Sequence, residues 1–234
     1  MSIHLPFILH LLLGSLAVVC YWGALLARKG SLPHRRWGRA FFTLLLPVAL
    51  SVGPLLVLKA GRVQADYIVQ FSYLSLCLFT VGLVGWSAIR LKSDPERFRG
   101  WHFRLLGGLI FLGGMVVLGA GLAQGRLLPV VFSLIGLVFG GAMLRFAWQP
   151  GALPPRWWLG WHLNAVCLLV SAVHGTVLVV ALRSWFNPPP GEWLPVLCHG
   201  GMLVVALLMR LWLGRRYGLA SRHGSGEAGL LQAS

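Results

Sequence analysis

Seven long apolar segments constrain the fold of this 234-residue chain more than any other feature. A helix needs about 20 mainly apolar residues to cross the hydrocarbon core of a bilayer, and every segment is close to that length. The segments cover residues 5–27, 39–59, 67–91, 103–123, 128–147, 157–182 and 193–213. A transmembrane β-barrel would show apolar residues alternating along its strands, and runs such as LLLGSLAVV do not alternate. The sequence therefore predicts an all-α bundle of seven transmembrane helices.

Composition supports a membrane protein rather than a soluble domain. Only 11% of the residues are charged and 57% are hydrophobic, whereas a soluble domain is about 25% charged. The first segment lacks the basic start of a secretory signal peptide, so we expect it to remain as a helix. We predict two parts: residues 1–214 form the seven-helix transmembrane domain, and residues 215–234 form a cytoplasmic, disordered polar tail.

The basic residues predict the orientation of the bundle. If the seven segments alternate in direction, four of the 20 Lys and Arg residues fall on one side: Lys59, Arg62, Arg126 and Arg183. The others fall on the opposite side, and loops rich in Lys and Arg are retained in the cytoplasm. The N-terminus is therefore expected outside and the C-terminus inside. The net charge of +15 suits anionic lipid headgroups beside the helices, so the expected partner is the bilayer and not nucleic acid.

Several chemistries have little support in the sequence. The four cysteines lie inside apolar segments and form no C-x-x-C pair, which disfavours a disulfide framework or a zinc–thiolate site. The five acidic residues lie in loops, at segment edges or in the tail, so no carboxylate is left in mid-membrane to carry a proton or ion relay. No H-E-x-x-H or hydrolase nucleophile motif occurs. Whether the chain is an enzyme stays open.

Glycines recur on one face of two predicted helices. Gly107, Gly114 and Gly121 are seven residues apart, and Gly136 and Gly140 form a G-x-x-x-G pair. Small residues at such positions let neighbouring helices approach closely. A flat slot for a planar cofactor is the alternative, and helix packing is the favoured interpretation.

Three histidines lie within predicted spans: His10, His174 and His199. Each is about five to eight residues from the expected outer boundary of its segment, so all three are expected at a similar depth in the outer leaflet. Imidazoles in hydrocarbon are costly and usually face the bundle interior, where they have a partner or a function. Provided that their helices are neighbours, the three histidines predict a site in the outer half of the bundle.

The leading hypothesis for this site is b-type haem. Two imidazoles from different helices can hold a haem iron from both sides, so His174 and His199 would be axial ligands. His10 would be the alternate ligand or a hydrogen-bond donor, while Met202 is more simply a packing residue. Such a protein would transfer electrons, with quinol or a periplasmic protein as its redox partner.

Two alternatives need no haem. The same three histidines could hold zinc or copper. They could also only join helices in a non-enzymatic membrane subunit or sensor, by hydrogen bonds to a helix carbonyl or to Ser171. Asn164 and Ser171 are themselves interpreted as groups that form hydrogen bonds between helices.

The loop ARKGSLPHRRWGRAFF, residues 27–42, carries a distinctive pattern. Together with His10 in the preceding helix and the VHG sequence at His174, it resembles a bacterial family of multi-pass membrane proteins catalogued as a domain of unknown function. The loop positions that match are Lys29, Gly30, His34, Arg35, Gly38 and Arg39. The resemblance implies a bacterial inner-membrane location and transfers no activity. Considered physically, the basic residues suit the inner face, where His34 could bind a lipid phosphate together with Arg35 and Arg36.

Overall fold

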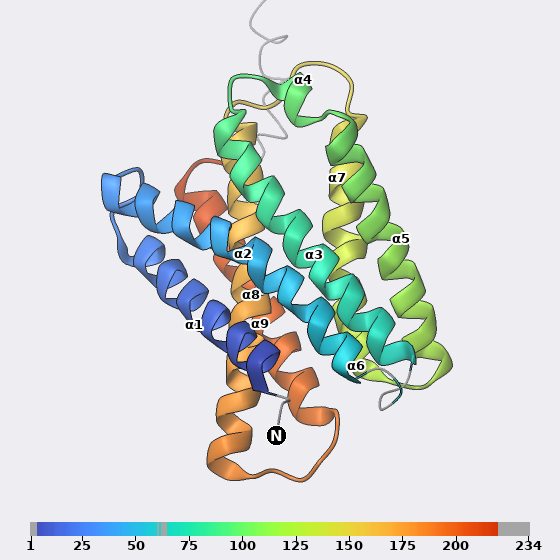
Figure 1. Cartoon of the computed structure of the whole chain (residues 1–234). Helices are drawn as coiled ribbons and strands as arrows, with labels where there is room; N and C mark the ends of the chain where they lie inside the picture. Colours follow the sequence, from blue (N-terminus) through green and yellow to red (C-terminus); the bar gives the residue numbers. More distant parts are fainter. Residues whose placement is uncertain (1–3, 60, 62–64, 220–234) are drawn as a thin grey trace, which may run out of the picture.

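The computed structural model of the chain describes residues 4–59, 61 and 65–219 (Figure 1). All regular elements in this part of the chain are helical, and seven helical stretches are long and apolar enough to cross a membrane. The predicted seven-helix bundle is confirmed. The predicted disordered tail falls mostly on residues 220–234, which lie outside the described residues.

The elements differ from the predicted spans mainly at their ends. α2 begins seven residues before the predicted span, α8 ends four residues after it, and the short α4 was not predicted. The fifth span consists of α6, η1 and α7 in direct succession. The bounds are α1 His4–Leu26, α2 Leu32–Lys59, α3 Ala65–Arg90, α4 Pro95–Phe98, α5 Trp101–Ala123, α6 Leu127–Leu134, η1 Ile135–Gly140, α7 Gly141–Ala147, α8 Trp157–Phe186 and α9 Trp193–Arg216.

Local capping explains the two displaced ends. The hydroxyl of Ser31 accepts a hydrogen bond from the backbone N–H of His34 at 3.3 Å, which caps the first turn of α2. Pro33 suits this turn because an N–H there would have no helical partner. At the other end, α8 stops where Asn187 adopts a left-handed backbone with φ 42°. Three prolines follow directly and cannot continue a helix.

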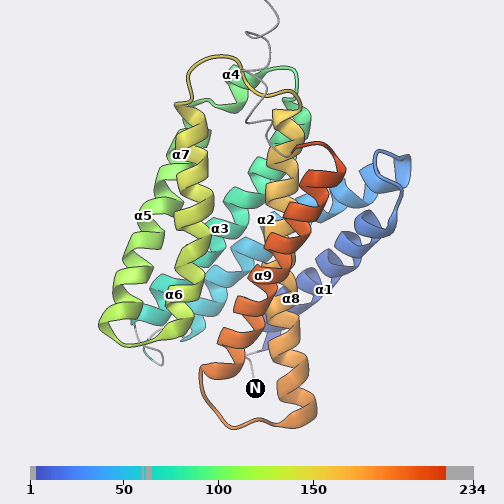
Figure 2. The same cartoon turned by 180° about the vertical axis from the view of Figure 1, so that it is seen from behind.

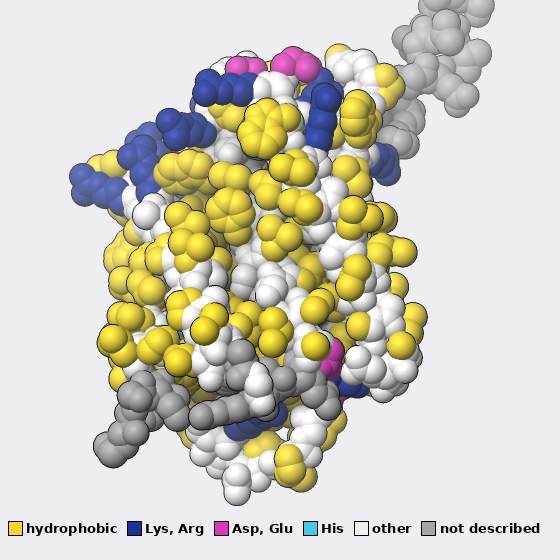
Figure 3. All heavy atoms as spheres, turned by 45° about the vertical axis from the view of Figure 1, so that its right-hand side comes forward, with side chains coloured by type: hydrophobic (Ala, Val, Ile, Leu, Met, Phe, Trp, Pro, Cys, Tyr) yellow, Lys and Arg dark blue, Asp and Glu magenta, His cyan; other side chains and the backbone are white. Residues whose placement is uncertain are grey.

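The helices form two layers (Figures 1 and 2). One layer contains α1, α2, α3 and α5, and the other contains α8, α9 and the continuous α6–η1–α7 rod. α3 packs against α2, α5 and α8, while α9 packs against α8 and α6. We call the end of the bundle that carries α4 and the turn between α1 and α2 the basic end. Figure 3 shows Lys and Arg gathered there above a largely hydrophobic side. Which end faces the cytoplasm stays a prediction.

A cluster of aromatic rings holds the basic end together. Phe98 of α4 is completely buried, and its ring centroid lies 4.8 Å from those of Phe103 in α5 and Trp157 in α8. Trp161, one turn further along α8, packs against Phe103 and against Phe146 of α7. Four elements that are distant in sequence are therefore fixed around one ring, which also fixes the loops above it.

The glycine faces bring α5 and the α6–η1–α7 rod into close contact. A Cβ atom at Gly136 would lie 2.1 Å from the carbonyl oxygen of Ile110, and one at Gly140 would lie 2.9 Å from that of Gly107. A Cβ atom at Gly114 would lie 3.1 Å from the carbonyl oxygen of Ser133. Backbone of the neighbouring helix therefore occupies these faces. The interpretation as helix packing is confirmed, and the alternative of a cofactor slot is wrong.

The π-helical stretch η1 begins at the point where a tyrosine from α3 enters the rod. The buried hydroxyl of Tyr73 accepts a hydrogen bond from the N–H of Gly136 at 2.8 Å. It lies 3.2 Å from the carbonyl oxygen of Phe132 and 3.3 Å from that of Ser133, to which it donates. A π turn leaves backbone groups of the α-helical ladder without their usual partners. Tyr73 supplies a partner for them.

Candidate functional site

His174 lies on α8 and joins this helix to α1. Its Nε2 accepts a hydrogen bond from the indole N–H of Trp22 at 3.0 Å, so the proton of the neutral ring is on Nδ1. Nδ1 donates to the carbonyl of Val170 at 3.0 Å, one turn earlier in α8. The rings of Tyr21 and Trp22 lie 5.7 and 5.5 Å from the imidazole. Both nitrogens of His174 are therefore engaged.

His199 lies at the same level of the bundle on α9. A Cβ atom at Gly175 would lie 2.3 Å from its Nδ1, so the imidazole rests on α8 where that helix has no side chain. The ring of Phe132 in α6 lies 4.8 Å from it. Among the described residues His199 has no hydrogen-bond partner. His174 and His199 are thus neighbours in height, but they contact different faces of α8.

His10 lies apart from the other two histidines. Its Nδ1 is 2.7 Å from the hydroxyl of Ser51 on α2. Because that hydroxyl donates to the carbonyl of Val48, the imidazole is the donor in this pair. His10 is twelve residues before Trp22, the residue that contacts His174, which separates them by about 18 Å along α1. The structure brings α1, α8 and α9 close through Trp22 and Gly175, but it does not bring the three histidines to one place.

No metal site is assembled within the described part of the chain. No three His, Cys, Asp or Glu side chains there are grouped so that they could hold one ion. The four cysteines are buried and free. Met202, the alternative sulfur ligand, packs against the hydrophobic core. In this conformation His10, His174 and His199 do not form a zinc or copper site.

The motif of the first loop builds the turn between α1 and α2. The ammonium of Lys29 donates to the carbonyls of Ala24 and Leu25 at the end of α1. Partial burial lowers the pKa of Lys29 from its ordinary value. Gly30 makes the turn with φ 80°, a backbone conformation that favours glycine. His34 returns to the same helix end, where its Nδ1 donates to the carbonyl of Ala24 at 2.9 Å.

The other residues of this motif make fewer contacts. Arg35 and Arg39 are exposed on the first turns of α2, and a Cβ atom at Gly38 would meet no atom within 4 Å. Trp37 packs on Gly23 of α1, where a Cβ atom would lie 2.6 Å from the indole. Lys29, Gly30 and His34 are therefore explained by the turn, while the two arginines are free to meet headgroups.

A second intramembrane histidine contact escaped the sequence-based site. His162 of α8 donates from Nδ1 to the carbonyl of Gly85 on α3 at 3.0 Å. Asn164, two residues later, accepts a hydrogen bond from Arg210 of α9, which confirms its predicted role between helices. Ser171 donates instead to the carbonyl of Leu168 in its own helix at 2.8 Å, so its predicted role was wrong.

An arginine joins three segments at the end opposite the basic end. Arg126, between α5 and α6, forms ion pairs with Asp66 at the start of α3 and with Glu192 before α9. Its Nε lies 2.5 Å from the carboxylate of Glu192. All three side chains are partly exposed. Sequence alone did not predict this contact, because the two acids are 60 and 66 residues away from Arg126.

Replacing Arg126 by glutamine is expected to lower the free energy of unfolding by about 1 kcal/mol, because two carboxylates lose their shared cation at a partly exposed site. The thermal midpoint of the detergent-solubilised chain measures this, and the loss should shrink as sodium chloride screens the pairs. Arg183→Gln removes an exposed arginine of the same end and is the control. Equal losses in the two variants would contradict a specific role for Arg126.

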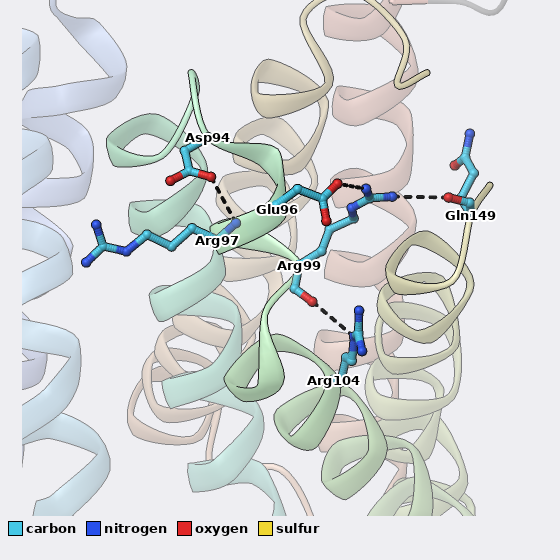
Figure 4. A network of polar contacts seen from close by, with 6 residues as sticks. All are labelled: Asp94, Glu96, Arg97, Arg99, Arg104 and Gln149. Carbon is cyan, nitrogen blue, oxygen red and sulfur yellow. Dashed lines mark hydrogen bonds and ion pairs between the residues drawn. The ribbon is translucent and has the colours of Figure 1, made fainter. Parts of the chain in front are cut away.

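A polar network covers the basic end at α4 (Figure 4). Asp94 caps this helix by accepting from the N–H of Arg97 at 3.0 Å. Arg99 pairs with Glu96 and donates to the carbonyl of Gln149 at 3.1 Å, which joins α4 to the segment after α7. The side chain of Arg97 points away from this group (Figure 4).

Comparison of the chain with protein-family models, with curated proteins and with solved structures gives no match. The assignment of a function therefore depends on the geometry of the chain itself.

Proposed function

We propose that this chain is a non-enzymatic integral membrane subunit or sensor whose intramembrane histidines join its helices. The observation that supports this most directly is the use of both nitrogens of His174, which connects α8 to Trp22 of α1. His10 connects α1 to α2 through Ser51, and His162 connects α8 to α3 through the Gly85 carbonyl. Hydrogen bonds of this kind stabilise helix association in a bilayer, where water offers no alternative partner.

We also propose that the basic end faces the cytoplasm and that the membrane is the bacterial inner membrane. The excess of Lys and Arg at this end supports the orientation. Cation–π contacts there, such as the Arg104 guanidinium 4.4 Å from the Trp148 ring, suit a membrane–water interface. The resemblance of the first loop to a bacterial family supports the location.

A b-type haem electron carrier is the second proposal, and one observation favours it. The Nδ1–H of His174 donates to a backbone carbonyl, which leaves Nε2 as the lone-pair nitrogen, as in most histidines that ligate metals. The residues do not fit a haem in the described conformation, because Trp22 occupies this Nε2 and His199 lies on another face of α8. Binding would require Trp22 to move.

Absorption spectra distinguish the two proposals. The full chain is purified in detergent from cells supplied with haem, and spectra are recorded before and after reduction by dithionite. The helix-joining role predicts no Soret band from folded protein. It would be refuted by a Soret band that shifts on reduction with sharp α and β bands and that is lost in His174→Phe; such a result would instead establish the haem carrier.

His174→Phe also tests the helix-joining role directly. The substitution leaves the indole N–H of Trp22 without its acceptor, so we expect the free energy of unfolding to fall by roughly 1 kcal/mol. His102→Phe is the matched control, since His102 contacts only the ring of Trp101 among the described residues. Thermal midpoints in detergent measure both variants. An unchanged midpoint in His174→Phe would argue against the role.

A further inference from the structure

A pocket of about 460 Å³ opens at the basic end, beside α4. One wall is the segment that links α3 to α5 and carries Lys92, Glu96 and Arg99. The other wall is the segment that links α7 to α8, with Arg156 and Trp158 at its end. Figure 1 shows these two segments together at the tip of the bundle. The volume is typical of sites for small molecules, which span roughly 300–1,000 Å³.

The charged groups of this pocket are mostly cationic. Lys92, Arg99 and Arg156 line it together with a single carboxylate, that of Glu96. This carboxylate is already paired with Arg99. Lys92 lies 6.0 Å from the ring of Trp158 and has no acidic partner among the described residues. The pocket therefore carries uncompensated positive charge.

Hydrogen-bond donors in the pocket are also incompletely used. The Nε of Arg99 is buried and has no hydrogen-bond partner, although the two other nitrogens of this guanidinium are bonded. Arg156 donates from Nη1 to the carbonyl of Tyr217 at 3.3 Å, which leaves its other donors without a partner. A buried donor without a partner is costly and uncommon in native proteins. Donors that meet around one pocket favour an acceptor-rich ligand.

The backbone adds a positive end to the same pocket. Arg156 precedes α8 with φ 60° and ψ 27°, the left-handed region that a non-glycine residue rarely adopts. No side chain caps the first N–H groups of this 30-residue helix. The positive end of the helix dipole therefore faces the pocket, where it stabilises an anion.

We propose that this pocket binds a phosphate group, with Lys92, Arg99 and Arg156 as the cations that hold it. Phosphate combines negative charge with several acceptor oxygens, and arginine forks match its geometry. The group could be the headgroup of an anionic lipid or a soluble phosphate compound, and both present the same chemistry to the pocket. The proposed binding does not depend on the role of the histidines.

Calorimetric titration of the full chain with inorganic phosphate, in nanodiscs of phosphatidylcholine, tests the soluble source. The thermal midpoint in nanodiscs with and without phosphatidylglycerol tests the lipid source. Binding of inorganic phosphate assigns a soluble ligand. A rise of the midpoint with phosphatidylglycerol and no phosphate binding assigns a lipid. The absence of both effects would overturn the proposal.

Variants tie either effect to the pocket. Arg156→Gln and Lys92→Gln should each weaken binding by about tenfold, because each removes a charge-assisted hydrogen bond. Arg97→Gln removes the same charge from α4 on a side chain that points away from Arg99 (Figure 4), so it should bind as the unmodified chain does. An equal loss in Arg97→Gln would mean attraction by net charge alone and would refute the site. Midpoints without ligand identify any variant that fails to fold.

Discussion

Replacing Gly136 by alanine is expected to lower the free energy of unfolding by about 3 kcal/mol, at the upper end of the range for overpacked sites. The added methyl group would lie 2.1 Å from the carbonyl oxygen of Ile110 and 2.6 Å from the hydroxyl of Tyr73. The closer atom belongs to the backbone of α5, which cannot rotate away as a side chain can. The helix and η1 must therefore separate, and contacts are lost along the whole glycine face.

The thermal midpoint in detergent measures this loss, which corresponds to a fall of roughly 10 °C for a chain of this size. Gly119→Ala is the matched control, because Gly119 lies on α5 and a Cβ atom there would meet no atom within 4 Å. Its midpoint should stay constant or rise slightly, since alanine favours a helix more than glycine does. Equal midpoints for the two variants would show that α5 and η1 are not in close contact.

The sequence predicted the features of the fold that depend on length and local composition. Seven spans follow from the extent of apolar sequence, and the close approach of α5 to η1 follows from the spacing of Gly107, Gly114 and Gly121. The ends were less predictable. Hydropathy falls at Arg35 and Arg36, but the capping by Ser31 lets α2 include both of these residues. A cap is a matter of geometry that composition does not record.

The candidate site was predictable only in part, for a related reason. Intramembrane histidines were expected to face the interior, and His174 and His199 do lie at one level of α8 and α9. The partner of His174 is Trp22, which is 152 residues away along the chain. The pocket at the basic end similarly combines Lys92 with Arg156 from a distant segment. Contacts over such distances follow from helix packing, and one sequence contains no signal for them.

The same limit applies to η1, and Tyr73→Phe tests the contact that causes it. We expect the free energy of unfolding to fall by about 2 kcal/mol, since the N–H of Gly136 and the carbonyl of Ser133 lose a partner in a region without water. Thermal midpoints measure the loss, and amide hydrogen exchange at Gly136 should become faster. Tyr21→Phe is the control, because the Tyr21 hydroxyl forms no hydrogen bond among the described residues. If the two substitutions cost the same, the tyrosine hydroxyl does not stabilise the π turn, and its cause must lie in the glycine contacts alone.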